Sequence, residues 1–216
     1  SPTSREQHRF VEHLIRERGL PCTVELVDFF AFRPRERFAG AVFLGTLEHV
    51  VDYRYAARFL AAHLAPGGRV YADFVARRAG FRTGRFLHRW IWPGTTRYVD
   101  LAALVRALGD AGFHLHELGD DGLSYAWTVR DWAQRLERHR KTLAERFGER
   151  AVRAFLLYLW GSYHFLERGH TLAYHLVAAR EQHRHARRLR VAVAVQRALC
   201  KRGHFRFRRR LRADVE

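Results

Sequence analysis

Methionine is absent from this 216-residue chain, and cysteine occurs only at Cys22 and Cys200. Without an initiator methionine, we expect Ser1 to be a processed end or a cut. Two distant cysteines in a charged chain give neither a disulfide framework nor a metal-binding spacing. No apolar run approaches the ~20 residues of a membrane-spanning helix, and no signal peptide is recognisable. We therefore expect a cytoplasmic protein without a metal site.

The composition otherwise favours a globular domain with a basic tail. Hydrophobic residues make up 48% of the chain and aromatic residues 13%, and this length suits one core. The segment 181–216 holds 12 Arg and Lys against three Asp and Glu, about half of the net charge of +17. We expect a domain over 1–180 and a tail that is attracted to phosphate. No nucleic-acid-binding module is recognisable in this tail. The favoured partner of the tail is therefore an anionic membrane surface, at the inner face of the membrane, and not nucleic acid.

Hydrophobic periodicity predicts helices that alternate with strands. The order fits an α/β fold with a doubly wound parallel sheet. Residues 77–98 are rich in arginine and aromatic residues and are interpreted as a lid-like insertion. The predicted helices are 4–18, 53–64, 101–111, 128–147 and 150–167, and the predicted strands are 23–29, 39–46 (a buried one), 69–75, 113–118 and 172–177.

The most informative stretch is Val42-Phe-Leu-Gly-Thr-Leu-Glu-His-Val50. An apolar run ends at Gly45 and is followed at once by the pair Glu48-His49. This pattern is typical of a strand that delivers a carboxylate to the carboxyl edge of an open α/β sheet, where such folds bind ligands. The alternative is an acid that only caps the next helix.

This stretch resembles the fourth-strand motif of the cyclopropane fatty acid synthase family, which includes mycolic acid cyclopropane synthases and uses S-adenosylmethionine (SAM). The resemblance covers roughly residues 1–180. It implies a Rossmann-like SAM-dependent methyltransferase fold with a helical lid insertion. The first strand and the Gly-rich loop that should hold SAM are absent from this sequence, so a complementing N-terminal half is an implied partner.

The resemblance also implies residues that contact SAM. In Pro2-Thr-Ser-Arg-Glu-Gln7, Ser4 and Gln7 match a family element on the ribose side. Asp28 and Phe29 resemble an acid-aromatic pair beside the adenine, and Gly45 belongs to the same cofactor site. The alternatives are that Ser4 is a plain helix cap and that Asp28 caps the following turn.

The implied catalytic residues are Glu48, Tyr125 and Asp73. In the family, residues matching Glu48 and Tyr125 bind a bicarbonate that removes a proton after methyl transfer to an alkene. Tyr125 could otherwise be half-buried packing. Asp73 stands where bicarbonate-binding members have a histidine, and a second carboxylate repels an anion. Asp73 is then itself the base, or the reaction is a simple methyl transfer, which suits a small amine.

Trp90-Ile-Trp-Pro-Gly94 resembles a family element that lines the lipid entrance, with Trp90, Trp92 and Pro93 as lining residues; the alternative is an ordinary turn. The leading hypothesis is a methyltransferase of the cyclopropane-fatty-acid-synthase type that acts on an unsaturated lipid acyl chain. The second is a methyltransferase of a small amine or other soluble acceptor. The third is a catalytically incomplete fragment that acts as a binding or structural module. The histidines, such as His164 and His175, are interpreted as structural or surface residues.

Overall fold

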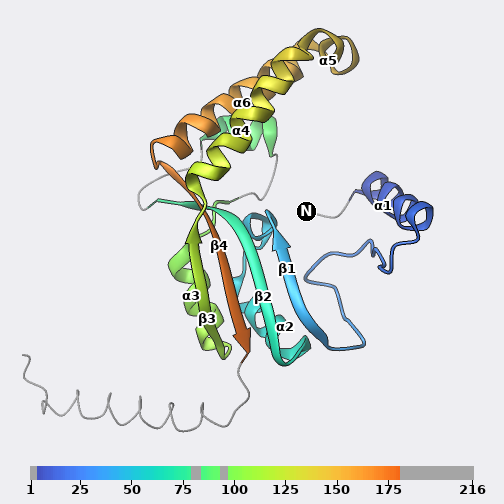
Figure 1. The fold of residues 1–216 in the computed structure, drawn as a ribbon, viewed down its shortest axis with the longest axis vertical. Coiled ribbons are helices and arrows are strands. Elements are labelled where there is room, and N and C mark those ends of the chain that lie inside the picture. The colour runs from blue at the N-terminus through green and yellow to red at the C-terminus, as the bar shows by residue number, and fades with distance from the viewer. Residues whose placement is uncertain (1–3, 79–83, 93–96, 181–216) are drawn as a thin grey trace, which may run out of the picture. The chain divides into compact units, whose positions relative to one another are not determined.

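The computed structural model describes residues 4–78, 84–92 and 97–180. The basic tail, Pro2 and Pro93 lie outside these described residues. The fold is α/β, as the sequence predicts (Figure 1). The elements are α1 (Arg5–Arg18), β1 (Phe38–Leu44), η1 (Leu47–His49), α2 (Tyr53–His63), β2 (Leu64–Arg77), η2 (Leu87–Ile91), α3 (Leu101–Asp110), β3 (Phe113–Asp120), α4 (Gly122–Arg138), α5 (Arg140–Phe147), α6 (Glu149–Glu167) and β4 (Thr171–Arg180).

The described strands form one sheet in the order β1-β2-β4-β3. β1 is parallel to β2, whereas β4 is antiparallel to both β2 and β3. The carboxyl ends of β1, β2 and β3 therefore share one edge (Figure 1). The prediction of a wholly parallel sheet is wrong for β4. Only three residues separate α6 from β4, so β4 starts at this edge and must run the opposite way.

Helices α2 and α3 cover one face of the sheet (Figure 1). Alternate residues of β2, from Val70 to Ala76, are buried against these helices. The prediction that the strand over 39–46 is buried is wrong, because Val42 and Leu44 of β1 are 66% and 62% exposed. β1 lies at the edge of the sheet, and no described helix covers the face that carries these two side chains.

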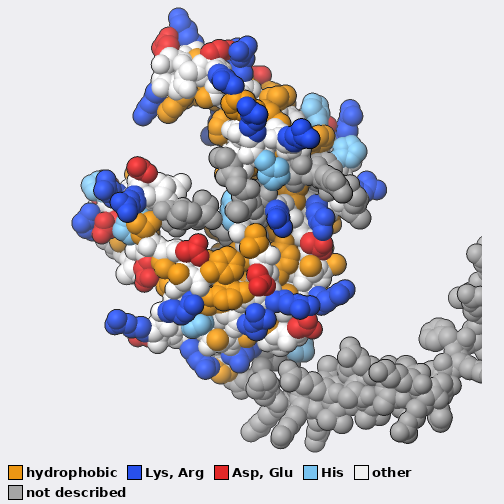
Figure 2. All heavy atoms as spheres, turned by 180° about the vertical axis from the view of Figure 1, so that it is seen from behind, with side chains coloured by type: hydrophobic (Ala, Val, Ile, Leu, Met, Phe, Trp, Pro, Cys, Tyr) orange, Lys and Arg blue, Asp and Glu red, His pale blue; other side chains and the backbone are white. Residues whose placement is uncertain are grey.

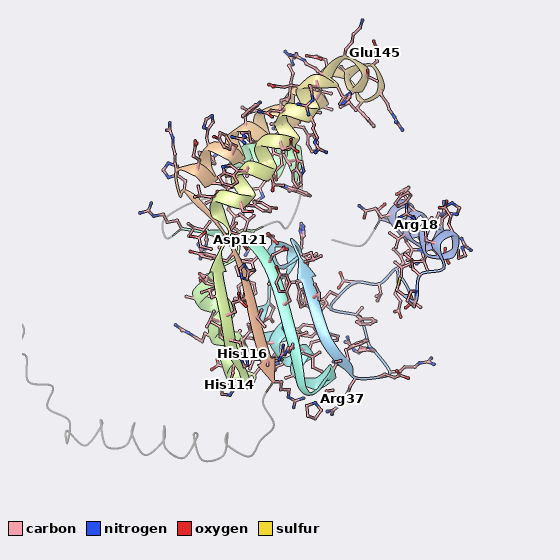
Figure 3. All side chains as sticks on the ribbon, viewed as in Figure 1. Arg18, Arg37, His114, His116, Asp121 and Glu145 are labelled. Atoms are coloured by element: carbon pink, nitrogen blue, oxygen red, sulfur yellow. The ribbon has the colours of Figure 1, made fainter. Side chains whose placement is uncertain are left out.

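Helices α4, α5 and α6 form a helical arm that projects beyond the carboxyl edge (Figure 1). α4 and α6 pack through a second core, which includes Ala126, Val129, Ala133, Leu159 and Leu166. The sequence predicts two helices here, but the structure divides the first at His139. Figure 3 shows Glu145 of α5 near the tip of the arm.

The segment between α1 and β1 contains no strand, so the predicted strand over 23–29 is wrong. Its alternating residues have no neighbouring strand in the described structure to take their backbone hydrogen bonds, and a lone strand is not stable. Helix α1 forms as predicted. Ser4 caps its start, and Gly19 ends it with the positive φ of 58° that favours glycine.

Candidate active site

Glu48 lies in a short 3-10 helix directly after β1, as the strand-end motif predicts. Gly45, with a φ of 56°, makes the turn that leads into this helix. The Glu48 side chain is buried, and its Oε1 accepts a hydrogen bond from the backbone N–H of Val75 at 2.7 Å. Its Oε2 has no hydrogen-bond partner among the described residues. One carboxylate oxygen is thus anchored, and the other is buried without a hydrogen-bond partner among the described residues.

Burial raises the pKa of the Glu48 carboxyl, and the charge of Asp73 adds to this effect. The Val75 hydrogen bond opposes the shift because it favours the charged form. A carboxylate with a raised pKa and an unsatisfied oxygen is a stronger base than an ordinary glutamate and is suited to take up a proton.

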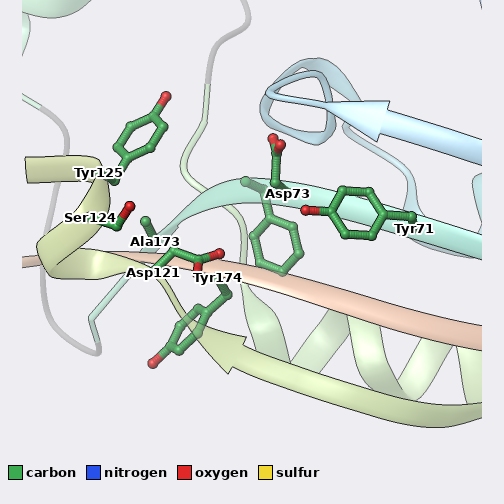
Figure 4. A pocket seen from close by; sticks show the side chains of 8 residues that line it. Tyr71, Asp73, Asp121, Ser124, Tyr125, Ala173 and Tyr174 are labelled. Atoms are coloured by element: carbon green, nitrogen blue, oxygen red, sulfur yellow. The ribbon is translucent and has the colours of Figure 1, made fainter. Parts of the chain in front are cut away.

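Asp73 lies on β2 and bridges to β1. Its Oδ1 accepts a hydrogen bond from the backbone N–H of Gly45 at 2.6 Å. Asp73 therefore fixes the turn at Gly45, and it also lines a pocket of about 160 Å³ (Figure 4). Figure 4 shows Ser124 and Tyr125, from the start of α4, across the pocket from Asp73 and Tyr71. Glu48 is not among the residues that line this pocket, which also include Phe74, Asp121, Ala173 and Tyr174.

Tyr125 lies in the first turn of α4, not ahead of the helix as the sequence predicts. The helix starts earlier because Asp120 Oδ1 accepts a hydrogen bond from the Gly122 N–H at 2.8 Å and turns the chain there. Burial, reinforced by the charges of Tyr158, Glu48 and Asp73, raises the pKa of Tyr125 to about 12. Tyr125 therefore stays protonated and can donate a hydrogen bond.

Sequence reasoning missed two further tyrosines near Glu48. Burial raises the pKa of Tyr98 to about 12 and also raises the pKa of Tyr158, and the Glu48 charge contributes to both shifts. Tyr98 precedes α3 and Tyr158 lies in α6. Neither tyrosine belongs to a local motif. Only the tertiary fold brings them close enough to Glu48 for its charge to affect their pKa values.

A second missed group surrounds His175 of β4. Its Nδ1 lies 2.6 Å from Asp121 Oδ2, and its Nε2 lies 3.3 Å from Glu117 Oε1. The hydrogen bonds to Asp121 and then to Glu117 raise the pKa of His175. Figure 3 places Asp121 where β3 meets α4, and His116 lies near the middle of β3. The sequence signal was only the turn-forming pair Asp120-Asp121.

The residues expected to contact SAM lie in local turns and caps. Ser4 Oγ accepts the Gln7 N–H at 3.4 Å and donates to Glu6 at 2.6 Å. Asp28 Oδ1 accepts the Phe30 N–H at 2.8 Å, so one of its two carboxylate oxygens closes a turn. The Phe29 ring packs edge-on against its aromatic neighbours Phe30, Phe43, Tyr55 and Phe59.

The predicted lid is represented by η2 and Trp92. Trp90 lies under the guanidinium of Arg150 at 4.2 Å. Trp92 contacts His49, the neighbour of Glu48, with ring centres 6.0 Å apart, and Tyr158 with ring centres 6.4 Å apart. Trp92 therefore contacts two neighbours of Glu48: the next residue in the sequence and a tyrosine of α6. No group of metal-ligating side chains occurs in the described residues, and no helix among them has the length and apolarity to cross a membrane.

Comparison with known proteins identifies the family of this chain. Residues 2–176 match the family of mycolic acid cyclopropane synthetases. A probable fatty acid methyltransferase of Pseudomonas putida is 26% identical over an alignment of 176 residues, and the match covers 77% of this chain and 44% of that protein. The chain thus spans less than half the length of this curated relative.

Two solved structures share the fold. One is a cyclopropane synthase of Mycobacterium tuberculosis (19% identity, TM-score 0.74, 82% of this chain and 67% of that one). The other is a mycolic acid cyclopropane synthase complexed with S-adenosylhomocysteine (SAH) and CTAB (17% identity, TM-score 0.74, with the same coverage). Since the family match extends over most of the sequence, the chain belongs to the mycolic acid cyclopropane synthetase family.

Proposed function

We propose that this chain is part of a SAM-dependent methyltransferase of the cyclopropane-fatty-acid-synthase type, and that it transfers a methyl or methylene group to an unsaturated lipid acyl chain. The observation that carries the proposal is the buried Glu48 with one unpaired oxygen, placed at the carboxyl edge of β1. The family match supports the reaction type. The relative from Pseudomonas putida, a probable fatty acid methyltransferase, supports the acyl acceptor.

When bound, SAM supplies an electrophilic methyl group. Asp28 and Gly45 are candidates to contact SAM: one Asp28 oxygen closes a turn and the other can accept from a donor such as an amine, and no atom lies within 4 Å of the place where a Cβ at Gly45 would stand. Ser4, Gln7 and Phe29 complete the set that would hold the cofactor. These residues suit the nucleoside part of SAM. The Gly-rich loop that should also hold SAM would have to come from a segment outside this sequence.

Residues of this chain can accept the proton that ring closure releases. Methyl transfer to an alkene leaves a carbocation, and ring closure breaks a C–H bond of the new methyl group, whose electron pair forms the third ring bond. The proton can pass to the carboxylate oxygen Oε2 of Glu48, because the raised pKa makes this carboxylate a stronger base. Tyr125 and Tyr158 lie near enough for the Glu48 charge to raise the pKa of both side chains, and aromatic side chains near this carboxyl can help to stabilise a transient cation.

A second candidate function is methylation of a small amine, and the pocket lined by Asp73 and Asp121 favours it. A volume of about 160 Å³ holds a small cation rather than an acyl chain, and two carboxylates complement a positive charge. In this case Asp73 orients the amine, and no proton has to leave carbon. Bicarbonate is disfavoured in both readings because Asp73 adds negative charge beside Glu48.

Calorimetric titration of SAM and SAH into the 216-residue chain tests the proposal. Micromolar binding supports a working cofactor site and leads to assays with unsaturated phospholipids and with small amines. Methylation of amines alone would establish the second candidate. A folded, monodisperse sample that binds neither compound would contradict catalysis by this chain alone, and would support a binding or structural module that needs a complementing half.

A further inference from the structure

The side chain of His175 is held on the face of the sheet opposite α2 and α3. Its ring occupies the place where a Cβ would stand on Gly119, the residue that pairs with it on β3. Tyr71 of β2 stacks on the ring, with the two planes 15° apart. Asp121 and Glu117 face the two ring nitrogens. Contacts from β2, from β3 and from the residue before α4 therefore fix the position of this histidine.

The neighbours of His175 also line the pocket of about 160 Å³ (Figure 4). Asp121 and Tyr71 contact the ring and belong to the pocket lining. Asp73, which pairs with His175 between β2 and β4, lines the pocket as well. His175 itself is not among the lining residues. Its effect on a molecule in the pocket is therefore indirect, and passes through its charge and through the position of these three side chains.

The net charge beside the pocket depends on the protonation of His175. With a neutral ring, the carboxylates of Asp73 and Asp121 and the aromatic lining together suit a cation such as an ammonium group. A protonated ring places a positive charge beside Asp121 Oδ2, 2.6 Å away, and compensates this carboxylate. The other titratable groups around the ring are Glu117 of β3 and Tyr71 and Asp73 of β2. Hydrogen bonds to Asp121 and then to Glu117 raise the pKa of His175, so the protonated form persists above the ordinary value of 6.5.

The molecule as a whole does not attract a cation. The chain has a net charge of +17, and Figure 2 shows Lys and Arg side chains from the helical arm to the sheet domain. Such a charge distribution repels a cation at long range. The binding of a cation in this pocket therefore depends on the local carboxylates, and on whether a neighbouring positive charge compensates them.

We propose that His175 is a positioning residue of this pocket: it holds the Asp121 carboxylate at the pocket wall and, when protonated, weakens the binding of a cationic acceptor. The proposal rests on the second candidate function, in which this pocket receives an amine. The coupling is reciprocal, so a bound cation must also make His175 harder to protonate. The pocket then binds cations best above the pH at which His175 loses its proton.

Titration of tetramethylammonium into the full chain between pH 5 and 9, followed by NMR of the histidine ring signals, tests the proposal. This probe is charged at every pH, so any pH dependence belongs to the protein. The affinity of wild type should rise about fivefold over this range. The pKa of His175, whose signal is the one missing from the His175→Gln spectrum, should be lower with the probe than without it.

Three variants separate the charge of His175 from its place in the fold. His175→Gln should bind the probe at pH 5 about fivefold more tightly than wild type, and its affinity should stay constant as the pH rises. Glu117 faces the ring but does not line the pocket. Glu117→Gln should therefore move the rise in affinity to lower pH and leave the affinity at pH 9 unchanged. His116→Gln is the matched control, because His116 is an exposed histidine of β3 outside the pocket lining, and it should behave like wild type.

Any of three results would overturn the role of His175: no binding of the probe at any pH, a wild-type affinity that stays constant, or a His175→Gln variant that keeps the wild-type pH response. SAH titration separates this role from the methyltransferase function. A chain that binds SAH and binds the probe independently of pH contradicts the role of His175 alone. A chain that shows the pH-dependent binding of the probe but does not bind SAH contradicts the methyltransferase function alone.

Discussion

Oε1 of Glu48 lies 2.7 Å from the backbone nitrogen of Val75, and this single hydrogen bond ties the carboxylate after β1 to the neighbouring strand β2. It fixes the direction of the carboxyl group and leaves Oε2 without a partner among the described residues. This arrangement leaves a buried acceptor without a hydrogen bond. Such a group lowers the stability of the folded state, but it suits ligand binding or proton transfer.

Glu48→Gln should therefore stabilise the protein and inactivate it. At neutral pH the substitution removes a buried charge and keeps the acceptor for Val75, so the free energy of unfolding should rise by about 1 kcal/mol. Because the folded-state pKa of Glu48 is raised from its ordinary value of 4.5, the difference should vanish below pH 4.5, where the carboxyl is neutral in both states. Methyl transfer should fall about 100-fold or more. Denaturant unfolding at several pH values and an activity assay check both effects, and an equally active variant would contradict the assigned role.

Asp73→Asn should separate the structural role of Asp73 from its charge. The amide oxygen can still accept the Gly45 N–H, so the melting temperature should change by only a few degrees. Without the second carboxylate, an anion can approach Glu48 more easily. We expect wild-type activity to ignore added bicarbonate and the variant to respond to it. A wild-type enzyme that bicarbonate stimulates would show that Asp73 does not repel the anion.

The position of Glu48 could be predicted from sequence because its signal is local. An apolar run, Gly45 and the acid-histidine pair lie within nine residues, and the structure places Glu48 directly after β1. Tyr98 and Tyr158 gave no such signal, because they approach Glu48 from elements far along the chain. The strand expected over 23–29 has the right alternation but no neighbour to pair with, and pairing is a tertiary property.

His175 should make the stability of the sheet depend on pH. Asp121 and Glu117 face its two ring nitrogens, Tyr71 stacks on it with ring centres 6.2 Å apart, and Asp73 lies opposite on β2. The raised folded-state pKa means that this stabilisation is complete below the ordinary value of 6.5 and is lost as the pH rises through the folded pKa.

Comparing the unfolding free energies of wild type and His175→Gln between pH 5 and 8 checks this expectation, since the gap should narrow as the pH rises. His116→Gln is the control: His116 is an exposed histidine of the same strand as Glu117 (Figure 3). A gap that stays constant over the whole range would show that protonation of His175 does not contribute.

Gly119→Ala and Gly109→Ala should change stability in opposite directions. A Cβ at Gly119 would overlap the ring of His175, which Asp121 and Glu117 hold in place. We expect a loss of roughly 1–3 kcal/mol. A Cβ at Gly109, in α3, meets no atom within 4 Å, and alanine there should add about 0.5–1 kcal/mol. Thermal melts of the two variants measure both effects, and equal melting temperatures would show that His175 moves aside freely.

The most direct test of the central claim follows labelled methyl groups from SAM into acceptors, with purified wild type and Glu48→Gln. The account predicts label in an unsaturated phospholipid with wild type, and a loss of about 100-fold or more with the variant. A folded wild-type protein that binds SAH but labels no lipid, or labels lipid equally well without the Glu48 carboxylate, would contradict it.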